Sequence, residues 1–134
     1  GLGDVYKRQG DVITKDAKEL PLNARNFINQ YFSKPQISYI KIDSEFLSKK
    51  YEVTLTDRTE IDFDKKGNWT EVDCKKGAVP AALIPVSIKD YVKKNFPNEI
   101  ITKIERKGTG IEVELANDFS LKFNKKGQFV SMDD

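Results

Sequence analysis

The sequence predicts an α+β protein: a tandem repeat of one helix plus an antiparallel β-meander, with the helices packed on one face of the antiparallel sheet. Residues 20–40 align with 84–104, and residues 51–73 align with 111–133, in the same order along the chain. Such self-similarity is the signature of an internal repeat. Each copy begins with apolar residues at helical spacing and continues with alternating apolar and polar residues, the pattern of strands.

Each copy is expected to open with a helix. Apolar residues at positions i, i+3, i+4 and i+7 form one stripe along a helix. The stripe of the first helix is Ala24, Phe27, Ile28 and Tyr31, and its counterpart is Ile88, Tyr91, Val92 and Asn95. Pro21 and Pro85 fit the first helical turn, because the N–H groups of that turn have no acceptor within the helix and proline lacks an N–H. A capping box at Ser87-Ile88-Lys89-Asp90 is the alternative start of the second helix.

The strands of the first copy are expected over residues 37–43, 50–56, 59–64 and 68–73. Tyr51 and Val53 alternate with Glu52 and Thr54, so the sheet should have one apolar and one polar face. The turns at 64–67 and 124–127 each end in a glycine. Glycine accepts the left-handed conformation that closes a type I turn with a bulge.

The chain has 134 residues, the length of one ordinary domain. We expect residues 1–19 to be a leader and residues 20–134 to be a single pseudo-symmetric domain, made of repeat 1 (20–83) and repeat 2 (84–134). Residues 1–9 match nothing later in the chain, and we interpret them as a remnant of cloning or sequencing.

The composition excludes several classes of site. The chain has no histidine, so serine–histidine and cysteine–histidine catalysis and histidine metal sites are excluded. Lys and Arg number 23 against 21 Asp and Glu, a net charge of +2, which argues against a nucleic-acid partner. No apolar run approaches the length of a membrane span. The chain has one cysteine, Cys74, so an internal disulfide is excluded. Cys74 is expected to be a packed thiol; the alternatives are a nucleophile, an intermolecular disulfide partner and a lipid site.

Asp62 and Asp64 lie two apart on one expected strand, a spacing that places both carboxylates on one face. Calcium needs six to eight oxygen ligands, however, and the second copy has Lys122 and Asn124 at the matching positions. A solvated strand face with cross-strand charge pairs is therefore the expected role, and we predict no metal and no cofactor.

Several segments together resemble one family. They are FDKKGNWTEVDC, VPAALIP, IKDYVKKNFPNEIITKIER, IEVEL and LKFNKKGQFVSMDD. In this order they are similar to the PepSY-like, β-lactamase-inhibitor-like proteins of the Bacteroidetes, over roughly residues 12–134. The resemblance implies tandem αβ-repeats, secretion to the periplasm or the cell exterior after removal of a signal peptide, and no known catalysis. It supplies no ligand residues to carry over.

A partner-binding surface is expected on the open face of the sheet, opposite the helices. Large aromatic side chains among charged ones are typical of protein interfaces. The predicted binding residues are Trp69, Phe129, Tyr39, Lys41, Glu52, Glu112 and Glu114. The alternative for two of them is a bulge after the glycine turn, which would turn Trp69 and Phe129 toward the core.

The sequence thus predicts a secreted or periplasmic, non-catalytic binding module with a protein or peptide partner, and inhibition through the open sheet face is one form of that function. An accessory or sensory module that binds a peptide or small ligand between the repeats is the alternative. A small carboxylate-dependent enzyme is a third hypothesis, which requires an apolar cavity around one Asp or Glu.

Overall fold

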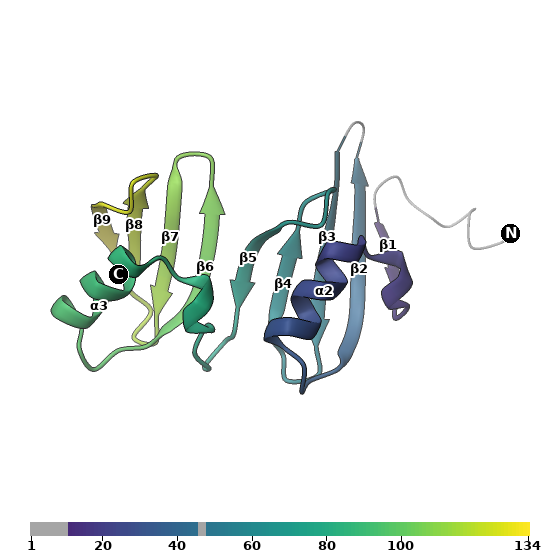
Figure 1. Ribbon diagram of the computed structural model, residues 1–134, viewed down its shortest axis with the longest axis horizontal. Coiled ribbons are helices and arrows are strands. Elements are labelled where there is room, and N and C mark those ends of the chain that lie inside the picture. The colour runs from purple at the N-terminus through teal and green to yellow at the C-terminus, as the bar shows by residue number, and fades with distance from the viewer. Residues whose placement is uncertain (1–10, 46–47) are drawn as a thin grey trace, which may run out of the picture. The chain divides into compact units, whose positions relative to one another are not determined.

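The computed structural model describes residues 11–45 and 48–134. Their strands form one nine-stranded antiparallel sheet in which the strands follow chain order (Figure 1). The strands are β1 (Asp11–Thr14), β2 (Ile37–Glu45), β3 (Ser48–Leu55), β4 (Glu60–Phe63), β5 (Trp69–Asp73), β6 (Ile101–Lys107), β7 (Gly110–Leu115), β8 (Ser120–Asn124) and β9 (Phe129–Asp133). The helices are α2 (Leu22–Tyr31) and α3 (Val86–Asn95), with short 3-10 turns η1 (Ala17–Glu19) and η2 (Ala81–Leu83).

The predicted tandem repeat of helix plus meander is wrong, although the chain is α+β in the broad sense. The meander does not stop after the first set of strands, because β5 pairs with β6 through Val72 opposite Ile104. In addition, β1 pairs with β2 and makes the number of described strands odd. The apolar pattern determines which face of a strand is buried, but it does not determine which neighbour satisfies the backbone groups along its edge.

The described chain divides into two compact units, with the boundary between Thr70 and Glu71, inside β5. The single domain over residues 20–134, with copies at 20–83 and 84–134, stays a prediction. Of the expected leader, residues 1–10 lie outside the described residues, and so does the proposed remnant at 1–9. The remainder of the leader includes β1 and η1, which the sequence pattern did not indicate.

In the first unit, α2 lies across one face of β2, β3 and β4 (Figure 1). Its predicted apolar stripe faces the sheet, since Ala24 and Ile28 are buried. The apolar side chains that alternate along the strands complete this core and are almost wholly inaccessible to solvent: Ile40, Val53, Leu55, Ile61 and Phe63. Burial of this set is the main favourable term that holds the helix on the sheet.

In the second unit, α3 contributes Ile88 and Val92 to the core. The strand residues that pack with them are fully buried: Val72, Ile104, Val113, Leu115 and Leu121. Pro85 is the residue before the helix, which begins at Val86 with no side-chain cap, so the capping box at Ser87 does not form. Both prolines therefore precede the first helical turn, because Pro21 occupies the same place before α2.

The hairpin between β4 and β5 follows the predicted turn chemistry. The Asp64 carboxylate accepts hydrogen bonds from the backbone N–H groups of Lys66 and Asn68, both at 2.9 Å. Gly67 has φ of 83°, the left-handed conformation expected of the fourth turn residue. Gly67 also lies directly against Asn23 and Pro21, where a Cβ atom would collide with their side chains. This contact fixes the hairpin against the start of α2.

Candidate functional site: the open face of the sheet

The open face of the first unit, on the side away from α2, carries a hollow of about 220 Å³. Strands β2, β3 and β4 position its walls, because residues two apart on a strand point to the same face. Its polar lining side chains are Tyr39, Lys41, Glu52, Thr54, Glu60 and Asp62. The apolar residues between them in sequence point to the core, so a packed layer supports the floor of the hollow.

The strand register brings these side chains together. Lys41 lies opposite Glu52, which in turn lies opposite Asp62. Lys41 Nζ is 3.7 Å from Glu52 Oε2, an ion pair with both side chains partly exposed. Tyr39 lies opposite Thr54 and is 41% exposed. With Glu60 included, three carboxylates and one lysine line the hollow.

The predicted residues Tyr39, Lys41 and Glu52 are therefore brought together in one hollow. Glu112 and Glu114 lie on the open face of the second unit, where Glu112 is opposite Lys122 and Glu114 is opposite Lys103. These two acidic residues share a separate, polar surface.

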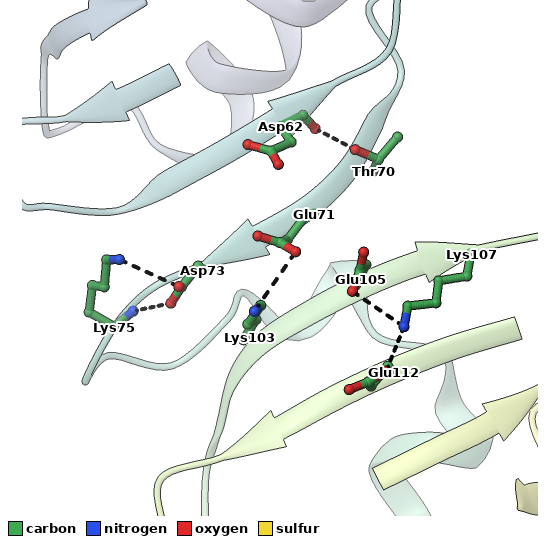
Figure 2. A network of polar contacts seen from close by, with 9 residues as sticks. All are labelled: Asp62, Thr70, Glu71, Asp73, Lys75, Lys103, Glu105, Lys107 and Glu112. Atoms are coloured by element: carbon green, nitrogen blue, oxygen red, sulfur yellow. Dashed lines mark hydrogen bonds and ion pairs between the residues drawn. The ribbon is translucent and has the colours of Figure 1, made fainter. Parts of the chain in front are cut away.

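Ion pairs link the strands of that second surface (Figure 2). Lys107 Nζ is 2.8 Å from Glu112 Oε1 and 3.8 Å from Glu105 Oε1. Lys103 Nζ is 3.8 Å from Glu71 Oε1, which joins β6 to β5. The Glu112 carboxylate, through its hydrogen bond and its charge, raises the pKa of Lys107 above the ordinary value, and the Glu105 charge adds to this.

Trp69 and Phe129 lie on the helix side of the sheet, which is the alternative that the sequence left open for them. The Trp69 ring stacks on Phe27 of α2, with centroids 6.1 Å apart and planes 29° apart. The Phe129 ring stacks on Tyr91 of α3, with centroids 4.7 Å apart and planes 10° apart. Neither aromatic ring therefore belongs to the open face.

A β-bulge explains the orientation of Phe129. Ser131 pairs with Lys122 and Phe129 pairs with Phe123, so Val130 is an extra residue without a partner on β8. Such an insertion shifts the alternation of a strand by one residue. Phe129 consequently turns to the face of buried Phe123.

The predicted binding residues do not include three residues of the hollow, Thr54, Glu60 and Asp62. Their signal was available, since the same alternation that selects Glu52 places them on the polar face. Asp64 does not join Asp62, because it lies beyond the end of β4 and its carboxylate is bound to the turn. Within residues 11–45 and 48–134, no group of three or more Cys, Asp or Glu side chains is arranged to hold a metal ion.

Cys74 follows the end of β5 and is buried, in agreement with a packed thiol. Its backbone N–H donates to the Thr102 carbonyl at 2.8 Å. The helices that the structure describes all fall short of the length and apolar character that a bilayer crossing would require.

The chain is similar to proteins of known structure and to one family model. Residues 49–131 match the model described as "Putative beta-lactamase-inhibitor-like, PepSY-like". A "putative periplasmic protein of unknown function" from Bacteroides vulgatus is 39% identical, with a TM-score of 0.90 over 93% of this chain and 100% of that one. A "putative calcium-regulated periplasmic protein" from Bacteroides thetaiotaomicron is 40% identical, with a TM-score of 0.88 over 100% of both chains.

A third structure, a "putative periplasmic protein" of the DUF2874 family from Bacteroides vulgatus, is 36% identical, with a TM-score of 0.87 over 92% of this chain and 97% of that one. No curated protein matches the chain. The predicted periplasmic or secreted location is confirmed by these neighbours, which are described as periplasmic. The family model covers more than half of the chain, and the resemblance found in the sequence is thereby confirmed: the protein belongs to the PepSY-like family.

Proposed function

We propose that this protein is a non-catalytic periplasmic binding protein that holds a partner protein against the open face of its first unit. The observation that carries the proposal is the exposed Tyr39 ring beside a hollow with three carboxylates and one lysine. Tyrosine supplies a large contact area with few rotatable bonds, which is why it is enriched at the energetic centres of interfaces.

The face is suited to binding without rearrangement. Behind the hollow, Ile40, Val53 and Ile61 are wholly buried, so β2, β3 and β4 form a rigid support. A surface that is already ordered loses little conformational entropy on association. The bound protein would cover a surface of its partner and so block the partner's other contacts. This chain would make or break no covalent bond.

The charge of the hollow indicates the kind of partner. Glu52, Glu60 and Asp62 outnumber Lys41, so the complementary surface should carry lysine or arginine side chains. A guanidinium group would also find the face of the Tyr39 ring within reach, an additional favourable contact. Electrostatic attraction between partly exposed groups weakens as salt is added, so affinity should fall between low and high ionic strength.

The other predicted binding residues have different places in the proposal. Glu112 and Glu114 supply a second polar patch on the open face of the second unit. Trp69 and Phe129 support binding indirectly, because they hold β5 and β9 against the helices.

The test is capture from periplasmic extract by the immobilised full chain and by two matched variants. Tyr39→Ala removes the exposed ring of the open face, while Leu22→Ala removes an exposed apolar side chain of α2, which is 63% exposed. The wild type and Leu22→Ala should capture similar amounts of a specific partner, and Tyr39→Ala should capture at least about 10-fold less. Equal capture by all three folded proteins would reject the open face as the binding surface.

Inhibition of an enzyme is one form that this binding takes, as the family description suggests. Likeness of fold does not carry interface contacts from one protein to another. We therefore expect weak or no inhibition of common β-lactamases, and nanomolar inhibition in a kinetic assay would contradict this. Each assay includes arms with calcium and with a chelator, because one relative is described as calcium-regulated.

A further inference from the structure

Strand β9 is the last strand in the order of the sheet, and along its outer side the described residues supply no further strand. Its apolar side chains are unusually accessible: Val130 is 61%, Met132 is 45% and Phe129 is 39% exposed. The outer side of an edge strand also presents a row of backbone N–H and C=O groups ready to pair. Val130 is the extra residue of the bulge and has no partner residue on β8.

The centre of this edge lacks the charges that usually prevent strand addition. The sequence Phe-Val-Ser-Met over residues 129–132 is uncharged, whereas lysine is a common protective residue on sheet edges. Charges occur only at the two ends of the strand. Lys125 and Lys126 precede it in the hairpin, and Asp133 and Asp134 close it, all four exposed.

We propose that the outer edge of β9 pairs with β9 of a second copy of this chain, antiparallel and centred near Val130. A second copy fits the charges of this strand, which is basic at its beginning and acidic at its end. The charges of the two copies are complementary only when the two strands are antiparallel. Lys126 of one copy then lies opposite Asp134 of the other, while Asp133 is already ion-paired with Lys122 of its own chain, at 3.8 Å. Parallel pairing would place like charges together.

Antiparallel pairing also brings the apolar centres together. Val130 of one copy meets Val130 of the other, Met132 lies opposite Gln128, and the apolar side chains lose contact with water. The arrangement is isologous, as in a two-fold symmetric dimer, and it closes without leaving a further copy of the same edge free. A pair of short strands buries a modest area, so a weak and reversible dimer is expected. The inference is independent of the proposed open-face binding, which uses other strands.

Sedimentation equilibrium of the full chain from about 1 µM to about 1 mM tests the proposal. The wild type should show a reversible monomer–dimer equilibrium. Val130→Lys places two like charges at the centre and should raise the dissociation constant at least about 10-fold. The matched control is Ile13→Lys on β1, a similarly exposed position at the other end of the sheet order, and it should leave the equilibrium unchanged.

A charge exchange tests the direction of pairing. Lys126→Glu and Asp134→Lys should each weaken the dimer, and the double variant should restore it. Thermal unfolding checks that every variant is folded. We expect all of them to fold, because the substituted positions are exposed. A wild type that stays monomeric up to about 1 mM would overturn the proposal. Equal weakening by Ile13→Lys and Val130→Lys would overturn it too, as would a double exchange that fails to restore association.

Discussion

The Phe129 ring of β9 lies almost parallel to the Tyr91 ring of α3, with centroids 4.7 Å apart. In the first unit, Trp69 stands in the same relation to Phe27 of α2, with planes 29° apart. Phe27 also meets Phe63 of β4 edge-on, with centroids 5.7 Å apart. The helix aromatic is thus held between two strands, and these rings attach the ends of β5 and β9 to the helical layer.

Trp69→Ala should therefore lower stability while the open face stays intact. We expect the free energy of unfolding to fall by about 2–4 kcal/mol, somewhat below the cost at a wholly buried site, because the side chain is half-buried. Urea denaturation followed by circular dichroism measures the change. Tyr39→Ala is the matched aromatic control on the open face and should cost less than about 1 kcal/mol. A larger loss for Tyr39→Ala than for Trp69→Ala would contradict the assigned faces.

The sequence predicted the faces of β2, β3 and β4 because regular alternation maps directly onto a pleated strand. Glu52 and Val53 lie on opposite faces, as their spacing requires. The same reasoning left two faces open for Phe129, because a bulge shifts the alternation of a strand by one residue. Its position depends on the hydrogen bonds that β8 offers, which no local pattern of side chains records.

The hollow was only partly predictable for a related reason. Alternation places Glu60 and Asp62 on the same face as Glu52, but the depression between them depends on the register that sets Glu52 opposite Asp62. The connection of β5 to β6 was missed because the likeness between the two halves of the sequence suggested separate meanders. Backbone pairing does not depend on side-chain identity, and it continues through this point.

Gly67→Ala should destabilise the first unit. The backbone at Gly67 is left-handed, and a Cβ atom would collide with the side chains of Asn23 and Pro21. We expect a loss of about 1–3 kcal/mol in the free energy of unfolding. Gly108→Ala is the control, because a Cβ atom there meets nothing within 4 Å. Thermal and urea unfolding of both variants should separate them; equal stability would mean that the hairpin moves away from α2 at no cost.

The Lys107 ammonium should titrate above its ordinary value of 10.5 because Glu112 stabilises its charged form. A folded-state pKa above the unfolded one gives a stabilising contribution that is present below the ordinary pKa and is lost as pH rises through the raised pKa. Glu112→Gln should move the Lys107 pKa down toward 10.5, with a small residual effect of Glu105. Heteronuclear NMR titration of Lys107 Nζ measures both values, and an unchanged pKa in the variant would contradict the cause assigned.

The Asp64 carboxylate can be tested against a replacement that the chain itself supplies. In the hairpin between β8 and β9, Asn124 Oδ1 accepts the equivalent bonds from the backbone N–H groups of Lys126 and Gln128, at 2.9 and 3.0 Å. An amide oxygen therefore suffices for this turn, so Asp64→Asn should change the free energy of unfolding by less than about 0.5 kcal/mol. Asp64→Ala leaves two N–H groups without their acceptor and should cost about 1–2 kcal/mol. Urea denaturation at neutral pH compares the two variants. A loss in Asp64→Asn as large as in Asp64→Ala would mean that the negative charge, and not the geometry of the acceptor, stabilises the turn.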